Sequence, residues 1–295
     1  MLDYILSCDS TIDLTKDHIQ NRGIVCIGFP FELGDKQYVD DLGEGISSKE
    51  FYGAMAQGAM TRTAQINAYQ FETYFEPFLK EGKDILHLCL SSGITGTMAS
   101  AKMAQESLKE KYPERTIYLV DSLAASSGEG LLVDKLADLR DEGMGIAELY
   151  QWAEENKRRV QHWFFSTDLQ YYVRGGRISK TAGTVGTMLG ICPLMNVSVD
   201  GKLIPREKIR SKKRVIQTIV DKMEQFADNG LDYDGTCYIS HSDSLEDAQQ
   251  VLSLIESRFP KMVGKVQIYN IGPVIGSHTG PGTVALFFWG AARVN

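Results

Sequence analysis

Short apolar segments alternate with amphipathic segments of about 10–15 residues along the first half of the chain. Residues 84–90 and 116–122 read as buried strands, whereas residues 98–111 and 126–142 have the apolar spacing of helices. Parallel strands need a crossover connection, usually a helix, so this alternation indicates a mostly parallel sheet with helices on both faces. We therefore expect an α/β fold.

Local signals mark further elements of this half. Residues 24–33 read as one more strand, and capping boxes open two helices, at Ser47 with Glu50 and at Asn67 with Gln70. In the second of these helices four aromatic residues share one face: Phe71, Tyr74, Phe75 and Phe78. Such a stripe usually packs into the core, although an apolar ligand could share it.

The chain of 295 residues has the length of about two domains. The pattern of strand and helix signals changes near residue 160. After it a hairpin is expected around Asp200-Gly201, followed by further helix and strand patterns. We expect an N-terminal α/β domain over residues 1–160 and a C-terminal α/β domain with a mixed sheet over residues 161–295.

A hydroxyl-rich loop, SSGITGT at residues 91–97, lies between a predicted strand and a predicted helix. A helix N-terminus at the carboxyl end of a parallel strand attracts anions, and Gly96 would let the backbone approach one closely. A P-loop is excluded because no lysine follows Gly96. The loop therefore suits a carboxylate or another anion, and a simple helix cap remains the alternative.

Three more hydroxyl-bearing clusters, at residues 8–11, 60–67 and 121–127, also fall at predicted strand ends or helix starts. One such cluster usually caps a helix, whereas several at the same edge of a sheet suggest a shared polar crevice.

Two motifs of the second half are candidates for contact with a ligand or a partner. Arg177 follows paired glycines in VRGGRIS, and such a turn could expose it to a partner or an anion; a solvated arginine beside a tight turn is the simpler interpretation. His278 and Thr279 lie within residues 270–286, a segment rich in glycine and proline that we expect to be a loop. A histidine in so constrained a loop favours ligand contact over a purely structural role.

Composition excludes several classes of protein. The net charge of −7 argues against nucleic acid and anionic membrane surfaces as general partners. The five cysteines are scattered without a C-x-x-C pair, which fits a reducing, cytoplasmic setting. No segment has the length of a membrane span, no signal peptide is recognisable, and no metal or hydrolase motif occurs, so we expect no integral membrane association and no cofactor.

Five stretches together resemble the DegV family of bacterial fatty-acid-binding proteins: CDSTIDL, TAQ, SSGITGTMASA, GGRIS and IGPVIGSHTGPG. The resemblance spans nearly the whole chain. It implies two α/β domains with one long-chain fatty acid between them, its carboxylate contacted by hydroxyls and its tail buried in an apolar slot. It further implies a non-catalytic subunit that presents the carboxylate to a separate kinase subunit, related to dihydroxyacetone kinases, for acyl-phosphate formation.

The resemblance assigns roles residue by residue. It assigns Thr63, Thr95 and His278 to the ligand and Arg177 to docking the kinase. Ser92, Gly96 and Thr279, which lie in the same loops as these residues, complete the ligand-binding candidates. The sequence also departs from the family pattern: Ala64 replaces a usual serine, Ile66-Asn67 replaces a usual Pro-Ser, and Thr95 stands where serine is common.

Two other functions remain open on the sequence. One is a small-ester or phosphate hydrolase in which a loop hydroxyl attacks with His278 as its base, although no spacing singles out the acid that would orient the histidine. The other is a regulatory protein for which the bound lipid is only a signal.

Overall fold

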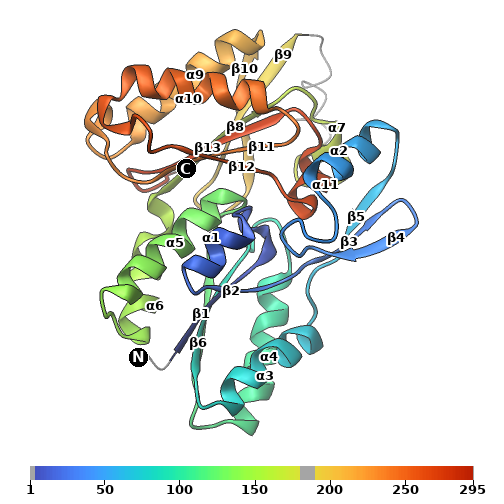
Figure 1. Cartoon of the computed structure of the whole chain (residues 1–295), viewed down its shortest axis with the longest axis vertical. Coiled ribbons are helices and arrows are strands. Elements are labelled where there is room, and N and C mark those ends of the chain that lie inside the picture. The colour runs from blue at the N-terminus through green and yellow to red at the C-terminus, as the bar shows by residue number, and fades with distance from the viewer. Residues whose placement is uncertain (1–3, 180–189, 295) are drawn as a thin grey trace.

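The computed structural model describes residues 4–179 and 190–294, which form a four-stranded, a six-stranded and a three-stranded sheet (Figure 1). The four-stranded sheet has the order β2-β1-β6-β7, and all its pairings are parallel. Its strands are β1 (Tyr4–Asp9), β2 (Val25–Ile27), β6 (Asp84–Cys89) and β7 (Ile117–Asp121). The predicted α/β class and the parallel sheet are thus confirmed.

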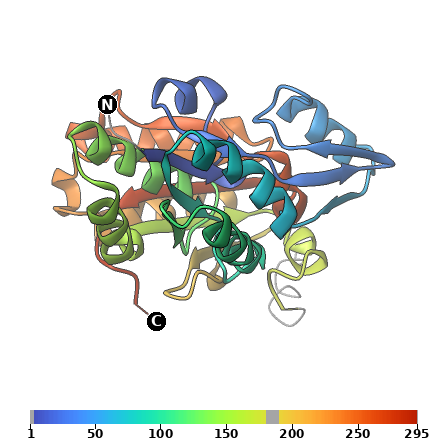
Figure 2. The same ribbon diagram turned by 90° about the horizontal axis from the view of Figure 1, so that it is seen from below.

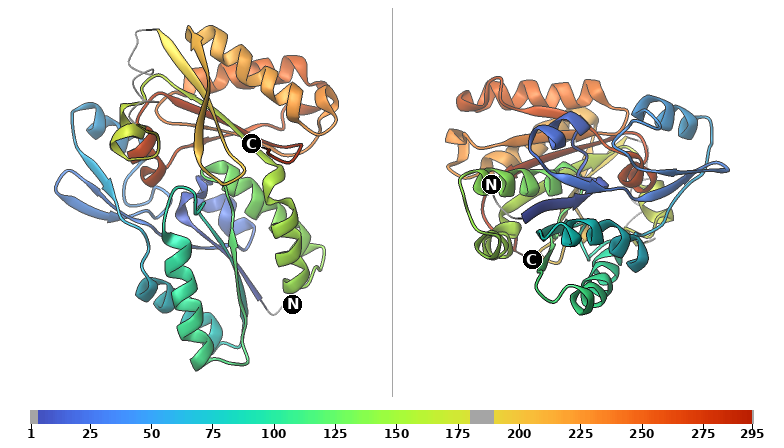
Figure 3. Two further views of the ribbon diagram at one scale, coloured as in Figure 1. Left: turned by 180° about the vertical axis from the view of Figure 1, so that it is seen from behind. Right: turned by 60° about the horizontal axis from the view of Figure 1, so that its bottom comes forward.

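Helices cover both faces of the parallel sheet, as Figures 2 and 3 show. On one face Leu86 and Leu88 share a core with α5 (Ser127–Asp141) and α6 (Ile146–Asn156). On the other face Ile85 and Cys89 share a core with α3 (Ala68–Lys80) and α4 (Thr97–Lys111). A strand buried on both faces reads as a continuous apolar run, which is the pattern that residues 84–90 display.

The capping boxes and the aromatic stripe are structural features. Both boxes form, at the starts of α2 (Ser48–Ala56) and α3. Phe71 and Phe75 are fully buried in the core between α3 and the sheet, and Tyr74 and Phe78 pack at its margin.

The prediction of a single strand over residues 24–33 is wrong. The segment divides into β2 and β3 (Pro30–Leu33), and β3 joins the three-stranded antiparallel sheet with β4 (Lys36–Val39) and β5 (Thr61–Thr63). The division falls at Gly28, where any Cβ would collide with the Val39 side chain and the Asp40 carbonyl. The chain therefore leaves the parallel sheet at Gly28, where the segment that contains Val39 and Asp40 packs against its backbone.

The six-stranded sheet has the order β10-β9-β8-β13-β11-β12 and is mixed, because only β11 and β12 pair in parallel. Its strands are β8 (Val160–Ser166), β9 (Ile191–Val197), β10 (Leu203–Arg210), β11 (Cys237–His241), β12 (Gln267–Asn270) and β13 (Thr283–Trp289). Helices α9 (Lys212–Phe226) and α10 (Leu245–Arg258) cover its outer face. The mixed sheet and the hairpin of β9 and β10 agree with the prediction, whereas the domain boundary near residue 160, where β8 begins, stays a prediction.

The remaining helices are short: α1 (Lys16–Asn21), α7 (Gln170–Arg174) and α11 (Pro273–Thr279). The expectation that His278 lies in a loop is wrong, because α11 places it in the last turn of a helix. Pro273 at the first helical position and Gly280, with φ of 66°, just past the end are the usual helix boundary signals.

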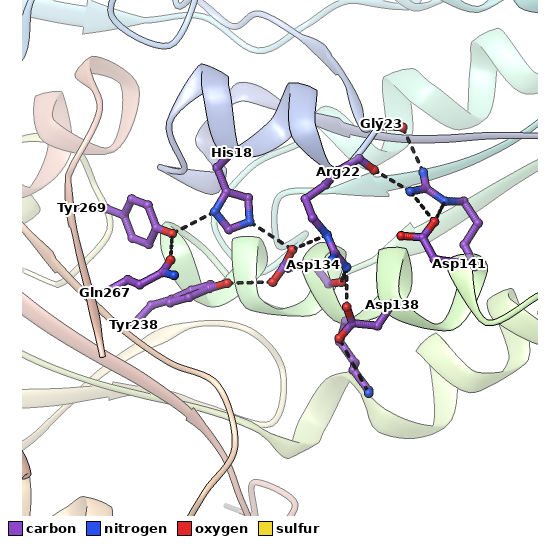
Figure 4. A network of polar contacts seen from close by, with 11 residues as sticks. His18, Arg22, Gly23, Asp134, Asp138, Asp141, Tyr238, Gln267 and Tyr269 are labelled. Carbon is purple, nitrogen blue, oxygen red and sulfur yellow. Dashed lines mark hydrogen bonds and ion pairs between the residues drawn. The ribbon is translucent and has the colours of Figure 1, made fainter. Parts of the chain in front are cut away.

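A polar network joins helices α1 and α5 to strands β11 and β12 of the six-stranded sheet (Figure 4). His18 on α1 lies between Asp134 on α5 and Tyr269 on β12, with both ring nitrogens 3.0 Å from their partners. The Tyr238 hydroxyl on β11 donates to the same Asp134 carboxylate at 2.7 Å. These contacts fix the inner face of the six-stranded sheet against the first half of the chain.

Candidate ligand-binding site

A cavity of about 330 Å³ lies between the inner face of the six-stranded sheet and the loops at the carboxyl ends of the parallel strands. Both halves of the chain line it, as expected for a ligand site of an open α/β sheet. Its volume falls in the range of about 300–1,000 Å³ that is usual for small-molecule sites.

One wall of the cavity is a pair of neighbouring strands. In the antiparallel register of β8 and β13, Phe164 lies opposite Ala285 and His162 opposite Phe287, and all four side chains line the cavity. Trp163, between them in sequence, points to the outer core beneath α9. The alternation of β-strand side chains thus supplies a slot that is apolar apart from His162.

The polar end of the cavity is built around His278. Its Nε2 lies 2.7 Å from the Thr63 hydroxyl at the end of β5. Burial, together with the charges of Arg177 and Arg174, lowers the pKa of His278 to about 4, so the ring is neutral at pH 7. Because Nδ1 packs against Gly175, where a Cβ would collide with it, the tautomer with its proton on Nε2 avoids burying an unpaired N–H.

Two buried polar atoms at this end, His278 Nδ1 and Thr279 Oγ1, have no hydrogen-bond partner within the described residues. Buried polar groups without partners are rare in native proteins and often mark a place where a ligand or water completes the contact. In the Nε2–H tautomer, His278 donates to the Thr63 oxygen and leaves the Thr63 hydroxyl proton available to a ligand.

The SSGITGT loop contributes Thr95 and Gly96, which line the cavity at the N-terminus of α4. The N-cap residue Gly96 has no side chain that could accept a hydrogen bond, and the partial positive charge of the N-terminus of α4 lies beside the cavity. The Thr95 hydroxyl lies 2.9 Å from that of Thr97 and accepts from the Thr97 N–H at 3.3 Å. Thr95 therefore has a partner inside the protein as well as a place in the cavity wall.

The structure does not bring Ser92 to the cavity. Ser91 is buried and donates to the Gly201 carbonyl at 2.8 Å without lining the cavity, whereas Ser92 is exposed and its N–H donates to Asp121. Of the other hydroxyl clusters, the one at residues 60–67 supplies Thr63 and the one at residues 121–127 supplies Ser126. The cluster at residues 8–11 lies outside the lining.

Arg177 is half-buried rather than fully exposed on its turn. It lines the cavity and also a neighbouring surface pocket formed with Ile94, Leu203 and Lys202. Its guanidinium donates to the Gly175 carbonyl, and burial lowers its pKa. Arg177 therefore stands between the cavity and the surface.

Sequence reasoning missed much of the lining. Gln65 belongs to a quoted motif and touches the cavity beside Gly96, where a Cβ would lie 2.5 Å from its side-chain oxygen. Phe164, Ala285 and His162 have no motif, and only the alternation along residues 160–166 and 283–289 could have identified their common face.

Two kinds of feature are absent from the described residues. Across residues 4–179 and 190–294, no group of three or more His, Cys, Asp or Glu side chains is arranged to hold a metal ion. No helix in the same part of the chain is both long and apolar enough for a membrane span.

Sequence comparisons find relatives along nearly the whole chain. A model of the DegV family, described as uncharacterised proteins, matches residues 6–290. A DegV domain-containing protein of Clostridium perfringens is 37% identical over 293 residues, which is 99% of each chain.

Solved structures show the same fold. A fatty-acid-binding DegV family protein from Thermus thermophilus is similar at a TM-score of 0.85 and 25% identity, covering 98% of this chain and 100% of its own. The fatty acid kinase B3 protein of Streptococcus pneumoniae, loaded with linoleic acid, is similar at a TM-score of 0.83 and 22% identity, covering 99% of this chain and 100% of its own. The chain described here belongs to the DegV family.

Proposed function

We propose that this protein binds one long-chain fatty acid in the cavity and presents its carboxylate to a separate kinase subunit for acyl-phosphate formation. The observation that carries the proposal is the arrangement of polar and apolar groups in one cavity. A donor-rich end at Thr63 and His278 continues into an apolar slot along β8 and β13. The bound fatty acids of the Thermus thermophilus and Streptococcus pneumoniae neighbours support the same ligand class.

The polar end suits a carboxylate. The hydroxyl proton of Thr63, the N-terminus of α4 and the half-buried Arg177 all favour negative charge there. The neutral His278 fixes the orientation of Thr63 and adds no formal charge of its own. The formal positive charge beside the carboxylate comes from Arg177, whose guanidinium also donates to the Gly175 carbonyl.

The apolar slot supplies affinity. Burying each methylene of an acyl chain contributes about 0.8 kcal/mol, so a long chain exceeds the cost of ordering the ligand. The lining of Phe164, Ala285, Phe287, Val197 and Leu203 offers an acyl chain only hydrocarbon contacts.

The position of Arg177 supports presentation to a kinase. This side chain reaches from the cavity to the adjacent surface pocket, so a partner that docks over that pocket would meet the carboxylate end of the ligand. We infer that the protein is itself non-catalytic and acts in the cytoplasm.

The hydrolase alternative lacks its third group. Thr63 and His278 are spaced like a nucleophile and its base, but His278 Nδ1 packs on Gly175 with no carboxylate partner in the described chain. A base without an orienting acid, with its pKa already lowered, is poorly suited to activate a threonine hydroxyl.

A reconstitution tests the proposal. Calorimetry with oleic acid should give about one site per chain, and a dihydroxyacetone-kinase-like subunit with ATP should form acyl-phosphate only when this protein is present.

Arg177→Ala should retain most of the oleic acid affinity and lower acyl-phosphate formation. Arg206→Ala, at an exposed arginine outside both pockets, serves as the control. Turnover of model esters that is lost in His278→Gln would instead establish the hydrolase.

A further inference from the structure

Two buried carboxyl groups lie behind the cavity wall, at the start of α11. Asp13 is 6% exposed and Asp40 is 4% exposed. Both carboxyls face the backbone of Gly272, because a Cβ built there would lie 2.9 Å from Asp13 Oδ1 and 3.6 Å from Asp40 Oδ2. Two neighbouring carboxyls in a buried place repel each other when both are ionised, so at least one of them favours its protonated form.

Asp13 anchors two segments of the cavity wall. Its Oδ1 accepts a hydrogen bond from the Gly272 N–H at 2.8 Å, and its Oδ2 accepts one from the Ser126 hydroxyl at 2.5 Å. Ser126 lines the cavity, as does Ile271, the neighbour of Gly272. Helix α11 begins at the next residue and carries His278. Asp13 therefore ties the first half of the chain to the helix that builds the polar end.

Asp40 is paired less completely. The Leu42 N–H donates to its Oδ1 at 3.2 Å and the Ser10 hydroxyl lies close, but its Oδ2 is buried without a partner among the described residues. Neither Asp13 nor Asp40 has a lysine, arginine or histidine partner within residues 4–179 and 190–294. A charged Asp40 would thus be buried without a compensating cation. The other titratable groups that act on the pair are acidic as well: Asp9, Asp41, Tyr52 and Glu129.

The pair changes its charge close to neutral pH. Burial, followed by the charges of neighbouring acidic groups, raises the pKa of Asp13 to about 8 and that of Asp40 to about 7. An unfolded aspartate has a pKa of about 3.9, so the unfolded chain releases these protons first. The stability of the folded protein therefore falls as the pH rises from about 4 to about 8.

We propose that Asp13 and Asp40 are positioning residues for the ligand: a proton held by this pair keeps the start of α11 and Ser126 in the cavity wall, and its loss weakens fatty acid binding. This rests on the proposed function and adds a dependence on pH to it. When both carboxyls are charged, their repulsion beside Gly272 acts against the hydrogen bonds through which Asp13 holds the wall.

Asp40→Asn tests the proposal, because it removes one charge and keeps an oxygen that can accept from the Leu42 N–H. Between pH 6.5 and pH 9, calorimetry on the wild type should show a fall in oleic acid affinity of at least about tenfold, and Asp40→Asn should show a fall of less than about threefold. Asp35→Asn, at an exposed acid between β3 and β4, should behave like the wild type. All three proteins meet the same ligand, so any effect of pH on free oleic acid is common to them.

Hydrogen exchange on the wild type gives a second readout that needs no variant. After correction for the intrinsic exchange rates, the protection of α11 (residues 273–279) should fall between pH 6.5 and pH 9, whereas that of α9 (residues 212–226), on the outer face of the six-stranded sheet, should stay constant. Equal changes in the two helices would overturn the positioning role, also where Asp40→Asn does not fold.

The outcomes keep this inference distinct from the proposed function. Wild-type protein that binds oleic acid equally well at both pH values overturns the role of the pair alone. So does an equal fall in affinity in the wild type and Asp40→Asn, because other groups would then cause the pH dependence. Protein that binds no oleic acid at pH 6.5 overturns the proposed function, and this inference with it.

Discussion

At its polar end the cavity offers hydroxyls, a neutral histidine and a helix N-terminus from three separate segments, around Thr63, Thr95 and His278, whereas its slot is the regular face of two paired strands. The polar end depends on loops and short helices that must meet in space. The slot depends only on the alternation of side chains along β8 and β13. The first region therefore sets the orientation of a ligand and the second sets how much binding energy it gains, and substitutions can test this division.

The largest effect is expected in the slot. Ala285 faces the cavity between Thr283 and Phe287, so Ala285→Phe should fill the path of the acyl chain. We expect the affinity for oleic acid to fall more than a hundredfold, because several methylenes at about 0.8 kcal/mol each lose their place. Ala285→Val should give an intermediate loss in the same calorimetric titration, and unchanged binding in Ala285→Phe would show that the chain does not follow these strands.

A smaller effect is expected at the polar end. Thr63→Val removes the hydroxyl that contacts His278 and nearly preserves side-chain volume. A hydrogen bond to a charged group contributes about 1.5–3 kcal/mol, so the oleic acid affinity should fall roughly ten- to a hundredfold. Thr63→Ser keeps the hydroxyl and serves as the control. Equal oleic acid affinities of the valine and serine variants would contradict a contribution of this hydroxyl to binding.

Thr95 should matter less than Thr63, because its hydroxyl already has Thr97 as a partner. If it also contacts the carboxylate, Thr95→Val should lower the oleic acid affinity about tenfold, and Thr95→Ser should bind like the wild type. If it acts only as a helix cap, the valine variant should lose about 1 kcal/mol of folding stability and bind normally. Melting temperature and affinity measured on both variants separate the two roles.

A pH titration of stability tests the neutral state of His278. Its folded-state pKa of about 4 lies below the usual value near 6.5, so its contribution is present above pH 6.5 and is lost as the pH falls toward 4. Between pH 7 and pH 5 the wild type should lose up to about 2 kcal/mol more unfolding free energy than His278→Gln, which cannot be protonated. Denaturant unfolding at the two pH values measures this difference, and equal losses would mean that His278 is not held neutral.

The sequence predicted the parallel sheet because apolar periodicity reports burial directly. It did not predict that residues 24–33 divide between two sheets, since that depends on the close approach of Val39 and Asp40 to Gly28. Within the polar end, the motifs identified Thr63, Thr95 and His278, all of which line the cavity. They did not distinguish the buried Ser91 from the exposed Ser92. These two serines are adjacent in sequence, and the conformation of the loop backbone decides which of the two hydroxyls is buried.

Native mass spectrometry of the protein purified from a bacterial host tests the central claim most directly, followed by identification of any released lipid after denaturation. The account predicts a mass excess that matches one long-chain fatty acid per polypeptide in the wild type, and none in Ala285→Phe. A wild-type protein that carries no lipid and shows no calorimetric response to added fatty acids would contradict it.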